Sequence, residues 1–256
     1  MSRHRFFVPS GLAREDGTVI VPLSDSDRHH AVHVLRVQPG EEIVVVEPSG
    51  SSLIVLVDSV RSDTVKGRFV AELPAVFEPR VTLMQGITKG STMDGIVQHA
   101  VELGVERIVP LLTARTIVRF EAPKAIERVQ RWQRIAEGAA GQSQRSRIPS
   151  VWAPERLRDA AASLGSFELA VVLWEESGAD GLARVLAGEG VSPDDPEMRI
   201  ALIVGPEGGL TSEEVRGLVT AGAHIASLGG AILRAETAAL AALTLTVDAL
   251  GGLGPA

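Results

Sequence analysis

Cysteine and tyrosine are absent from the 256-residue chain, and only 4% of its residues are aromatic. Without cysteine, the chain cannot form disulfides, thiolate zinc sites or iron–sulfur clusters, and it cannot use a cysteine nucleophile. Hydrophobic residues make up 45% of the chain and charged residues 22%. This composition is that of a soluble globular protein with one or two domains, not of a disordered or collagen-like chain.

Long hydrophobic runs are also lacking. Near the N-terminus only Phe6–Val8 are consecutively apolar before Pro9, which is too short for the apolar region of a signal peptide. No run reaches the ~18 apolar residues that a membrane-spanning helix needs. We therefore expect a cytoplasmic protein with no membrane partner.

Charge is unevenly distributed along the chain. The formal net charge of −7 is unusual for a nucleic-acid binder, because phosphates are bound mainly by lysine and arginine. Residues 115–147, however, carry eight basic side chains against three glutamates, a local net charge of +5. This basic segment is typical of a surface that holds a polyanion, although its helical part at 124–137 is equally compatible with a solvated, charged helix face.

Residues 1 to about 75 have the pattern of short strands separated by turns, which favours a small barrel or sandwich. Ser24 or Ser26 can cap a helix at 27–35. The expected strands are 42–47, 53–60 and 66–73. The segment 74–79, which contains two prolines, is the expected linker to a second domain.

From residue 80 onward, apolar strands alternate with amphipathic helices, which predicts a parallel sheet covered by helices on both faces. The expected strands are 81–87, 107–112, 169–174, 199–204 and 225–228, and the expected helices are 91–103, 124–140, 181–187, 211–222 and 235–250. Ser91 with Asp94, and Thr211 with Glu214, predict capping boxes at two helix starts. The last helix is apolar almost all round, so it should be buried on more than one side.

Three glycine-bearing loops follow expected strands, at 85–90, 205–209 and 228–233. None has the spacing of a P-loop or of a dinucleotide-binding turn, which argues against a kinase, a GTPase and a nicotinamide dehydrogenase. Ligands of parallel-sheet proteins bind beyond the carboxyl ends of the strands, and glycine lets backbone amides approach them. The loops therefore predict a ligand site, with ordinary strand-to-helix turns as the alternative.

Two pairs of polar residues stand out besides the loops. His29 and His33 have the i, i+4 spacing of a zinc site, but no HExxH motif or third ligand accompanies them, so we expect an exposed helix face and no metal. Arg234 and Glu236 stand at the start of the last expected helix. Arg234 can clamp an anion there, whereas Glu236 can accept a proton, hold Arg234 in place or favour the helix N-terminus.

A series of motifs occurs in order along nearly the whole chain. They are Arg5–Phe7, His30 with Val34–Arg36, Glu102–Val105, Gln142–Ser143 with Arg145 and Ile148–Pro149, Gly205–Gly209, Leu228–Gly229 with Ile232–Arg234, and Glu236–Ala238. Together they resemble the ribosomal RNA small subunit methyltransferase E family of the SPOUT superfamily. The chain departs from that pattern at Ala231, where arginine is usual, and at His99, where lysine is common.

The resemblance implies an α/β protein with a PUA-like, RNA-binding β-barrel at residues 1–75 and a SPOUT methyltransferase domain at 80–256, whose parallel sheet contains a deep trefoil knot. It implies a homodimer that uses S-adenosylmethionine (SAM) to methylate N3 of a uridine in 16S ribosomal RNA, either free or in the small ribosomal subunit. The lack of cysteine fits N3, because methylation of C5 normally needs a cysteine adduct. A noncatalytic RNA-binding assembly factor and a ribose 2′-O-methyltransferase of the same superfamily are the alternatives.

The resemblance also implies the roles of individual residues. Arg234 and Glu236 are the expected catalytic residues. The expected cofactor-binding residues are Leu173, Gly205, Glu207, Gly208, Leu228, Gly229, Ile232, Leu233 and Ala238. The expected RNA-binding residues are His30, Arg36, Lys89, Gln142, Arg145 and Arg147. Since aromatic side chains are few, RNA recognition should depend on shape and phosphate contacts rather than on stacking.

Overall fold

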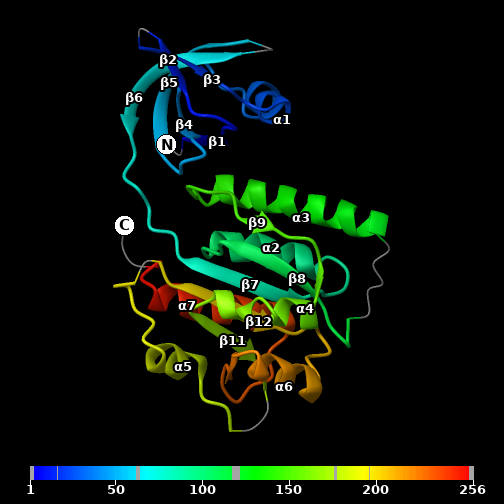
Figure 1. The fold of residues 1–256 in the computed structure, drawn as a ribbon. Helices are drawn as coiled ribbons and strands as arrows, with labels where there is room; N and C mark the ends of the chain where they lie inside the picture. Colours follow the sequence, from blue (N-terminus) through cyan, green and yellow to red (C-terminus); the bar gives the residue numbers. More distant parts are fainter. Residues whose placement is uncertain are drawn as a thin grey trace. The chain divides into compact units, whose positions relative to one another are not determined.

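A computed structural model of the chain describes residues 3–15, 17–61, 64–116, 122–175, 178–195 and 197–253. The chain divides into two compact units. The first contains residues 1–76 together with 140–148, and the second contains 77–139 together with 149–256. Each unit has its own sheet (Figure 1). Each also has its own hydrophobic core.

The first unit is built on a six-stranded sheet with the order β1-β4-β5-β6-β3-β2. Its strands are β1 (His4–Phe7), β2 (Ala13–Glu15), β3 (Thr18–Val21), β4 (Glu42–Val46), β5 (Ser52–Val60) and β6 (Val65–Glu72). The predictions of β4, β5 and β6 are confirmed, whereas the three short strands before them were not predicted. Among the described residues no ladder joins β1 to β2, so hydrogen bonding does not close the predicted barrel.

Local sequence explains the β4–β5 hairpin at the centre of this sheet. The β-branched residues Ile43–Val46 favour an extended backbone and are buried. The turn that follows needs a left-handed residue, which Gly50 provides with a φ of +92°, and the Gly50 amide donates to the Glu47 carbonyl at 2.8 Å. Val45 and Val55 then meet in the core of the unit.

A short helix follows β3. It begins as α1 (Asp25–His29) after Ser24, whose hydroxyl accepts a hydrogen bond from the Asp27 amide at 3.1 Å, so the predicted serine cap is confirmed. The chain then widens into a π-helical turn, His30–Val34, and reaches a φ of +53° at Arg36. The single helix predicted at 27–35 is therefore two consecutive helical segments.

The second unit contains a parallel sheet with the order β10-β8-β7-β12-β11-β13, and β9 also pairs with β8. Its strands are β7 (Arg80–Gly86), β8 (Arg107–Leu112), β9 (Ser150–Val151), β10 (Glu155–Arg156), β11 (Leu169–Leu173), β12 (Arg199–Val204) and β13 (His224–Ala226). The predicted parallel sheet is confirmed. Strands β9 and β10 were not predicted, because two residues are too few to show a period.

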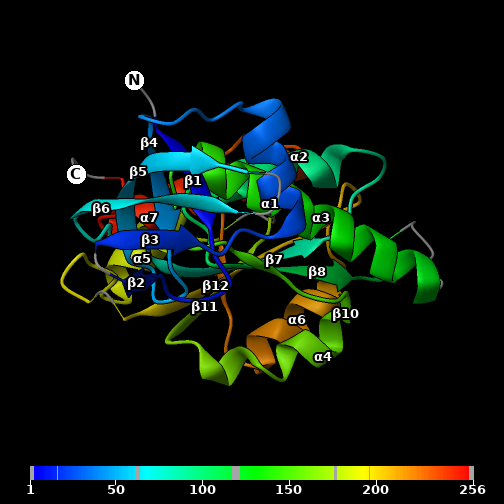
Figure 2. The ribbon, with the colours of Figure 1, turned by 90° about the horizontal axis from the view of Figure 1, so that it is seen from above.

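Helices cover both faces of the parallel sheet, as predicted (Figure 2). They are α2 (Thr92–Glu102), α3 (Ala122–Gln142), α4 (Leu157–Ala161), α5 (Leu182–Gly188), α6 (Ser212–Thr220) and α7 (Ala235–Ala249), with a 3-10 turn at Leu164–Ser166. On one face α7 packs against α2, α5 and the strands β7 and β12. On the other, α4 and α6 pack together over Met84, Val109 and Ile203. None of the described helices is long and apolar enough to cross a membrane.

Helix α7 is buried on more than one side, which confirms that prediction. Its residues Ala239, Ala242, Leu243 and Val247 are almost completely buried. They lie between the sheet on one side and α2 and α5 on the others. The nearly uniform apolar sequence of this helix is therefore explained largely by packing within its own unit.

The two predicted capping boxes have different outcomes. At α6 the Thr211 hydroxyl accepts from the Glu214 amide at 3.2 Å, and the Glu214 carboxylate accepts from the Thr211 amide at 2.8 Å, so the box is confirmed. At α2 the prediction is wrong, because Ser91 makes no side-chain cap. Asp94 instead accepts hydrogen bonds from Trp132 Nε1 at 3.1 Å and Arg131 Nη2 at 2.5 Å, and so holds α3 on α2.

Candidate active site

A cavity of about 590 Å³ lies at the carboxyl end of the parallel sheet. The loops that follow β11, β12 and β13 surround it together with the start of α2. Its lining residues are Thr92, Leu173–Glu175, Val204–Leu210, Ile232–Glu236 and Ala238. Parallel-sheet proteins bind ligands at this edge. The structure thus brings the glycine loops at 205–209 and 228–233 to one place.

The loop Gly205–Gly209 runs against the end of β7 with no room for a side chain between them. A Cβ atom on Gly86 would lie 2.7 Å from the carbonyl carbon of Gly205, and one on Gly205 would lie 2.9 Å from that of Gly209. Gly209 has a φ of +69°, which residues with side chains rarely adopt. The loop therefore lines the cavity with backbone atoms at Gly205, Gly208 and Gly209.

Two side chains, Gln85 of β7 and Glu207 of the glycine loop, connect this loop to β7 and to the segment that follows β7. The fully buried Gln85 amide nitrogen donates to the carbonyls of Gly86, at 2.9 Å, and Gly205, at 3.2 Å. The Glu207 carboxylate accepts a hydrogen bond from the Lys89 amide at 2.7 Å. These bonds fix the ends of β7 and β12 to each other, so a ligand in the cavity meets a surface that is already organised.

The loop after β13 borders a smaller hollow of about 80 Å³, which shares Leu173–Glu175, Leu233 and Ala238 with the larger cavity. Leu228 and Gly229 line this hollow, and Gly229 has a φ of +102°. Ile232 lines the larger cavity and is 83% exposed. All nine residues predicted to bind the cofactor therefore line one or both of these adjoining spaces.

Both residues predicted to be catalytic line the larger cavity. Arg234 is exposed at the N-cap position of α7, and Glu236 is half-buried in the first turn of that helix. Within the described part of the chain, these two side chains form no ion pair and neither caps the helix. The interpretation that Glu236 holds Arg234 in place is therefore not supported, and both charged groups are available to a ligand.

Comparison with known proteins identifies the family. Residues 77–247 match a model described as an RNA methyltransferase domain, and residues 23–51 match one described as an RNA methyltransferase PUA domain. A curated relative, ribosomal RNA small subunit methyltransferase E of Bacillus subtilis, is 31% identical over 94% of each chain. The chain belongs to the ribosomal RNA small subunit methyltransferase E family. The resemblance predicted from the motifs is confirmed.

Solved structures of related proteins match the fold of this methyltransferase. The Neisseria gonorrhoeae ribosomal RNA small subunit methyltransferase E bound to S-adenosylmethionine has a TM-score of 0.82 and 31% identity, covering 96% of this chain and 98% of that one. A Legionella pneumophila methyltransferase in complex with SAM has a TM-score of 0.82 and 28% identity, covering 97% and 98%. The α/β fold with a parallel sheet and a PUA-like N-terminal domain is thereby confirmed.

Most residues predicted to bind RNA lie in the first unit of the methyltransferase. They are His30, Arg36, Gln142, Arg145 and Arg147. All of these except Arg145 are exposed. The sixth, Lys89, is exposed in the second unit, where its backbone bonds to Glu207. The fold thus gathers residues from two distant parts of the sequence into one unit.

Arg145 differs from these neighbours because it is only 8% exposed. Its carbonyl accepts a hydrogen bond from Arg5 Nη1 at 3.0 Å, and the same nitrogen donates to Ser52 Oγ at 3.1 Å. Arg5 thus ties β1 and the start of β5 to the loop that follows α3. A buried side chain is poorly suited to a surface phosphate contact, so the exposed Arg147 is the better candidate for RNA binding.

Sequence analysis missed two residues that support the cavity, Gln85 and Arg115. Arg115 Nη1 donates to the Gly208 carbonyl at 2.6 Å. Gln85 begins the glycine-bearing loop 85–90 and Arg115 begins the basic segment 115–147, but neither pattern shows which residue is its partner.

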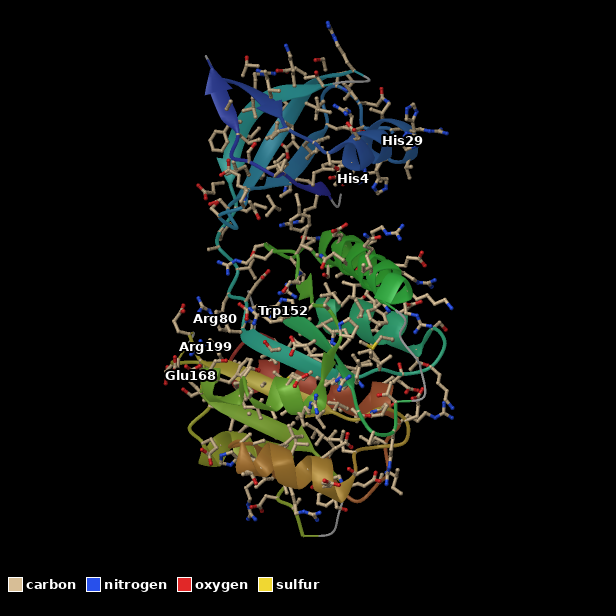
Figure 3. The ribbon with its side chains drawn as sticks, turned by 45° about the vertical axis from the view of Figure 1, so that its right-hand side comes forward. His4, His29, Arg80, Trp152, Glu168 and Arg199 are labelled. Atoms are coloured by element: carbon tan, nitrogen blue, oxygen red, sulfur yellow. The ribbon has the colours of Figure 1, made fainter. Side chains whose placement is uncertain are left out.

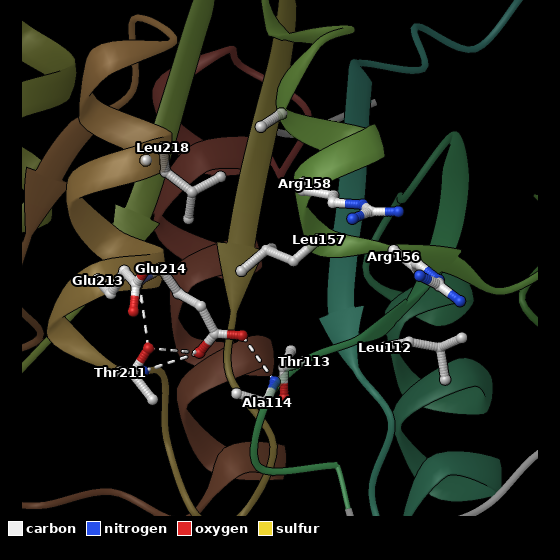
Figure 4. Close-up of a pocket in the computed structure, with 12 residues that line it drawn as sticks. Leu112, Thr113, Ala114, Arg156, Leu157, Arg158, Thr211, Glu213, Glu214 and Leu218 are labelled. Atoms are coloured by element: carbon white, nitrogen blue, oxygen red, sulfur yellow. Dashed lines mark hydrogen bonds between the residues drawn. The ribbon is translucent and has the colours of Figure 1, made fainter.

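A second cavity of the methyltransferase, of about 700 Å³, lies between α4, α6 and the end of β8 (Figure 4). It is lined by Leu112–Ala114, Arg156–Arg158, Ala161, Thr211, Glu213, Glu214, Gly217 and Leu218. None of the residues predicted to bind cofactor or RNA, or to take part in catalysis, lies on its wall.

Proposed function

We propose that the methyltransferase transfers the methyl group of SAM to N3 of a uridine in 16S ribosomal RNA, with free 16S rRNA or the small ribosomal subunit as substrate. The observation that carries the proposal is the cavity at the carboxyl end of the parallel sheet. It combines the glycine loops with Arg234 and Glu236. A family member that superposes over almost the whole chain is bound to SAM, which supports the same ligand here.

The residues of the cavity fit SAM. A volume of about 590 Å³ lies within the range of small-molecule sites, roughly 300–1,000 Å³. Leu173 and Trp174 supply apolar walls, while Gly205 and Gly208 supply backbone groups for the polar parts of the ligand. When bound, SAM supplies a methyl group on a positively charged sulfur. The protein's task is to hold that group in line with the acceptor.

Methyl transfer to N3 requires that N3 lose its proton, because its electron pair must form the new bond to carbon. The negative charge that develops spreads to the neighbouring carbonyl oxygens of the base. Arg234 stands at the cavity with its guanidinium exposed, where it can stabilise this charge. The Glu236 carboxylate, in the same cavity, can accept the N3 proton.

The amino-acid composition favours N3 over C5 as the acceptor. Methylation of C5 normally passes through a covalent adduct with a cysteine, which makes that carbon nucleophilic. The chain contains no cysteine. Deprotonation of N3 needs only a base and a nearby positive charge, which Glu236 and Arg234 supply.

We assign RNA binding to the PUA-like domain at residues 1–75 and methyl transfer to the domain at 80–256. The exposed side chains of His30 and Arg36 support the first assignment. The exposed Arg147 lies outside residues 1–75 in the sequence but belongs to the same compact unit. The exposed Lys89, next to the glycine loop, is proposed to contact RNA close to the reacting base. A ribosomal RNA substrate places the reaction in the cytoplasm.

The proposal includes a trefoil knot and a homodimer. Helix α7 follows the edge strand β13 yet packs against the central strands β7 and β12, as a chain threaded through its own loops would do. Ile232 beside the cavity and Leu245 on α7 are large apolar side chains exposed by 83% and 41%. A second copy that covers them would place each cofactor cavity near the subunit boundary.

Nucleoside mass spectrometry of 16S rRNA tests the proposed reaction. A deletion strain should lack one N3-methyluridine, and the wild-type gene should restore it where Arg234→Ala does not. Loss of a ribose 2′-O-methylated nucleoside instead would assign the methyl group to the ribose. Unchanged nucleosides together with defective subunit assembly would indicate the noncatalytic role.

A further inference from the structure

The turn between β8 and α3, residues 113–116, stands between the two cavities of the second unit. Thr113 and Ala114 line the 700 Å³ cavity. Arg115 extends from the same turn to the glycine loop of the 590 Å³ cavity. The turn therefore contacts the glycine loop through Arg115, and it lines the cavity beside α6 with Thr113 and Ala114.

Helix α6 holds this turn in place. One oxygen of the Glu214 carboxylate accepts a hydrogen bond from the Ala114 amide at 2.7 Å, and the other accepts from the Thr211 amide at 2.8 Å (Figure 4). Within the turn, the Thr113 amide donates to Thr116 Oγ1 at 2.9 Å. The backbone next to Arg115 is thus fixed by the carboxylate that also caps α6.

Arg115 in turn holds the glycine loop. Its Nη1 donates to the Gly208 carbonyl at 2.6 Å, and its Cβ lies 3.2 Å from where a Cβ on Gly208 would be. A hydrogen bond from a charged group is stronger than a neutral one, and it polarises the peptide so that the Gly209 amide becomes a better donor. Arg115 is not among the residues that line the cavity, so its contact with the site is through the Gly208 carbonyl.

We propose that Arg115 is a positioning residue for the cofactor loop Gly205–Gly209 and takes no part in RNA binding, although it belongs to the basic segment 115–147. The proposal rests on the proposed function only in that this loop binds SAM. Without the guanidinium, the Gly208 carbonyl loses this hydrogen bond, and SAM binds less tightly. The affinity for RNA, which depends on other basic residues, does not change.

Calorimetric titration of the full-length protein with SAM tests the proposal. Arg115→Ala should raise the Kd for SAM about 10-fold, the usual effect of losing one charged hydrogen bond, and should raise the KM for SAM more than it lowers kcat. Arg115→Lys should recover part of the affinity, because an ammonium group can still donate to the Gly208 carbonyl. Arg216→Ala, at an exposed arginine of α6, is the matched control and should leave the Kd unchanged.

A second pair of variants tests whether Glu214, which holds the turn at 113–116, affects SAM binding. Glu214→Ala should weaken SAM binding in the same direction, whereas Glu213→Ala, at the exposed neighbouring position, should not. In the double variant Arg115→Ala/Glu214→Ala the two effects should be less than additive, because both act on the same loop. Thermal unfolding of each variant separates loss of the α6 cap from loss of cofactor affinity.

Three outcomes would overturn the assignment of Arg115. They are an unchanged Kd for SAM in Arg115→Ala, a loss of RNA affinity in that variant, and additive effects in the double variant. Failure of the wild-type protein to bind SAM would contradict the proposed function instead, so the two failures can be distinguished.

Discussion

Glu168 and Arg199 form a bidentate ion pair at the amino ends of β11 and β12. Arg199 Nη2 lies 2.7 Å from Glu168 Oε1, and Arg199 Nε lies 3.1 Å from Oε2, which also accepts the Arg199 amide at 2.7 Å. Figure 3 shows the pair close to Arg80, whose guanidinium contacts Glu197 at 2.7 Å. The side-chain and backbone hydrogen bonds from Arg199 lower the pKa of Glu168 from 4.5 to about 2. Charged groups thus join the strands at the edge opposite the candidate active site.

This lowered pKa predicts how stability changes in acid. A carboxyl group whose pKa is lower in the folded state contributes its full stability above its ordinary pKa, here 4.5, and loses it as the pH falls toward 2. We expect Glu168→Gln to be less stable than the wild type at pH 7, by a small amount because the pair is exposed, and the difference to shrink below pH 4.5. Urea unfolding at a series of pH values measures this. A difference that stays constant down to pH 3 would contradict the prediction.

Gly208→Val should abolish SAM binding. The added side chain would begin 3.2 Å from Arg115 Cβ and would also fill part of the cavity wall that Gly208 forms. Calorimetry measures the affinity, and thermal unfolding shows that the variant is folded. Gly138→Ala in α3, where an added Cβ meets nothing within 4 Å, is the matched control. Normal SAM binding by Gly208→Val would remove this loop from the cofactor site.

Arg234→Ala should lower kcat by roughly 10²- to 10³-fold, the usual effect of removing one group that stabilises charge in a transition state. The Kd for SAM should change little, because the proposed role of Arg234 is toward the base. Steady-state kinetics with saturating SAM and RNA measure kcat. A variant with near-normal kcat but weak RNA binding would reassign Arg234 to substrate docking.

Glu236→Gln should remove the limb of the pH–rate profile that reports a general base. A glutamine side chain cannot take up the N3 proton at any pH, whereas a carboxylate can. Single-turnover rates between pH 5 and pH 9 measure the profile. If the variant is slower but keeps the same profile, Glu236 is not the base.

Arg147→Glu should weaken RNA binding and reduce its salt dependence by about one phosphate contact, while the affinity for SAM stays the same. The single variant is more informative than one that also changes Arg145, because a glutamate at that buried position would disturb the loop that Arg5 holds. Filter binding at several salt concentrations gives the slope. Arg61→Glu, at another exposed arginine of the first unit, is the control with the same change in charge.

Local patterns in the sequence predicted the features of the fold that depend on local interactions. The apolar runs at 107–112 and 199–204 predicted their strands, because a strand buried on both faces needs consecutive apolar residues. Thr211 and Glu214 predicted the start of α6, because a capping box depends only on residues three apart. The glycine loops are also made of residues that are close in the sequence, and they indicated where a ligand site would form.

The features that sequence analysis missed depend on contacts between distant residues. Ser91 and Asp94 have the spacing of a capping box, but Asp94 bonds to Trp132 and Arg131, which only the tertiary fold brings near. Arg145 was assigned to RNA from its motif and charge, yet its surroundings bury it. Arg115 was predicted only as part of the basic segment 115–147, because its partner Gly208 comes from a loop on another strand.

The close approach of Gly86 to the loop Gly205–Gly209 limits how this site can be engineered. No side chain fits between the end of β7 and this loop. A shift of either segment must therefore be matched by a shift of the other. An insertion or deletion in either loop would displace the other. Attempts to widen the cavity for a bulkier methyl donor should therefore begin at lining side chains outside this loop, Ile232 and Leu233.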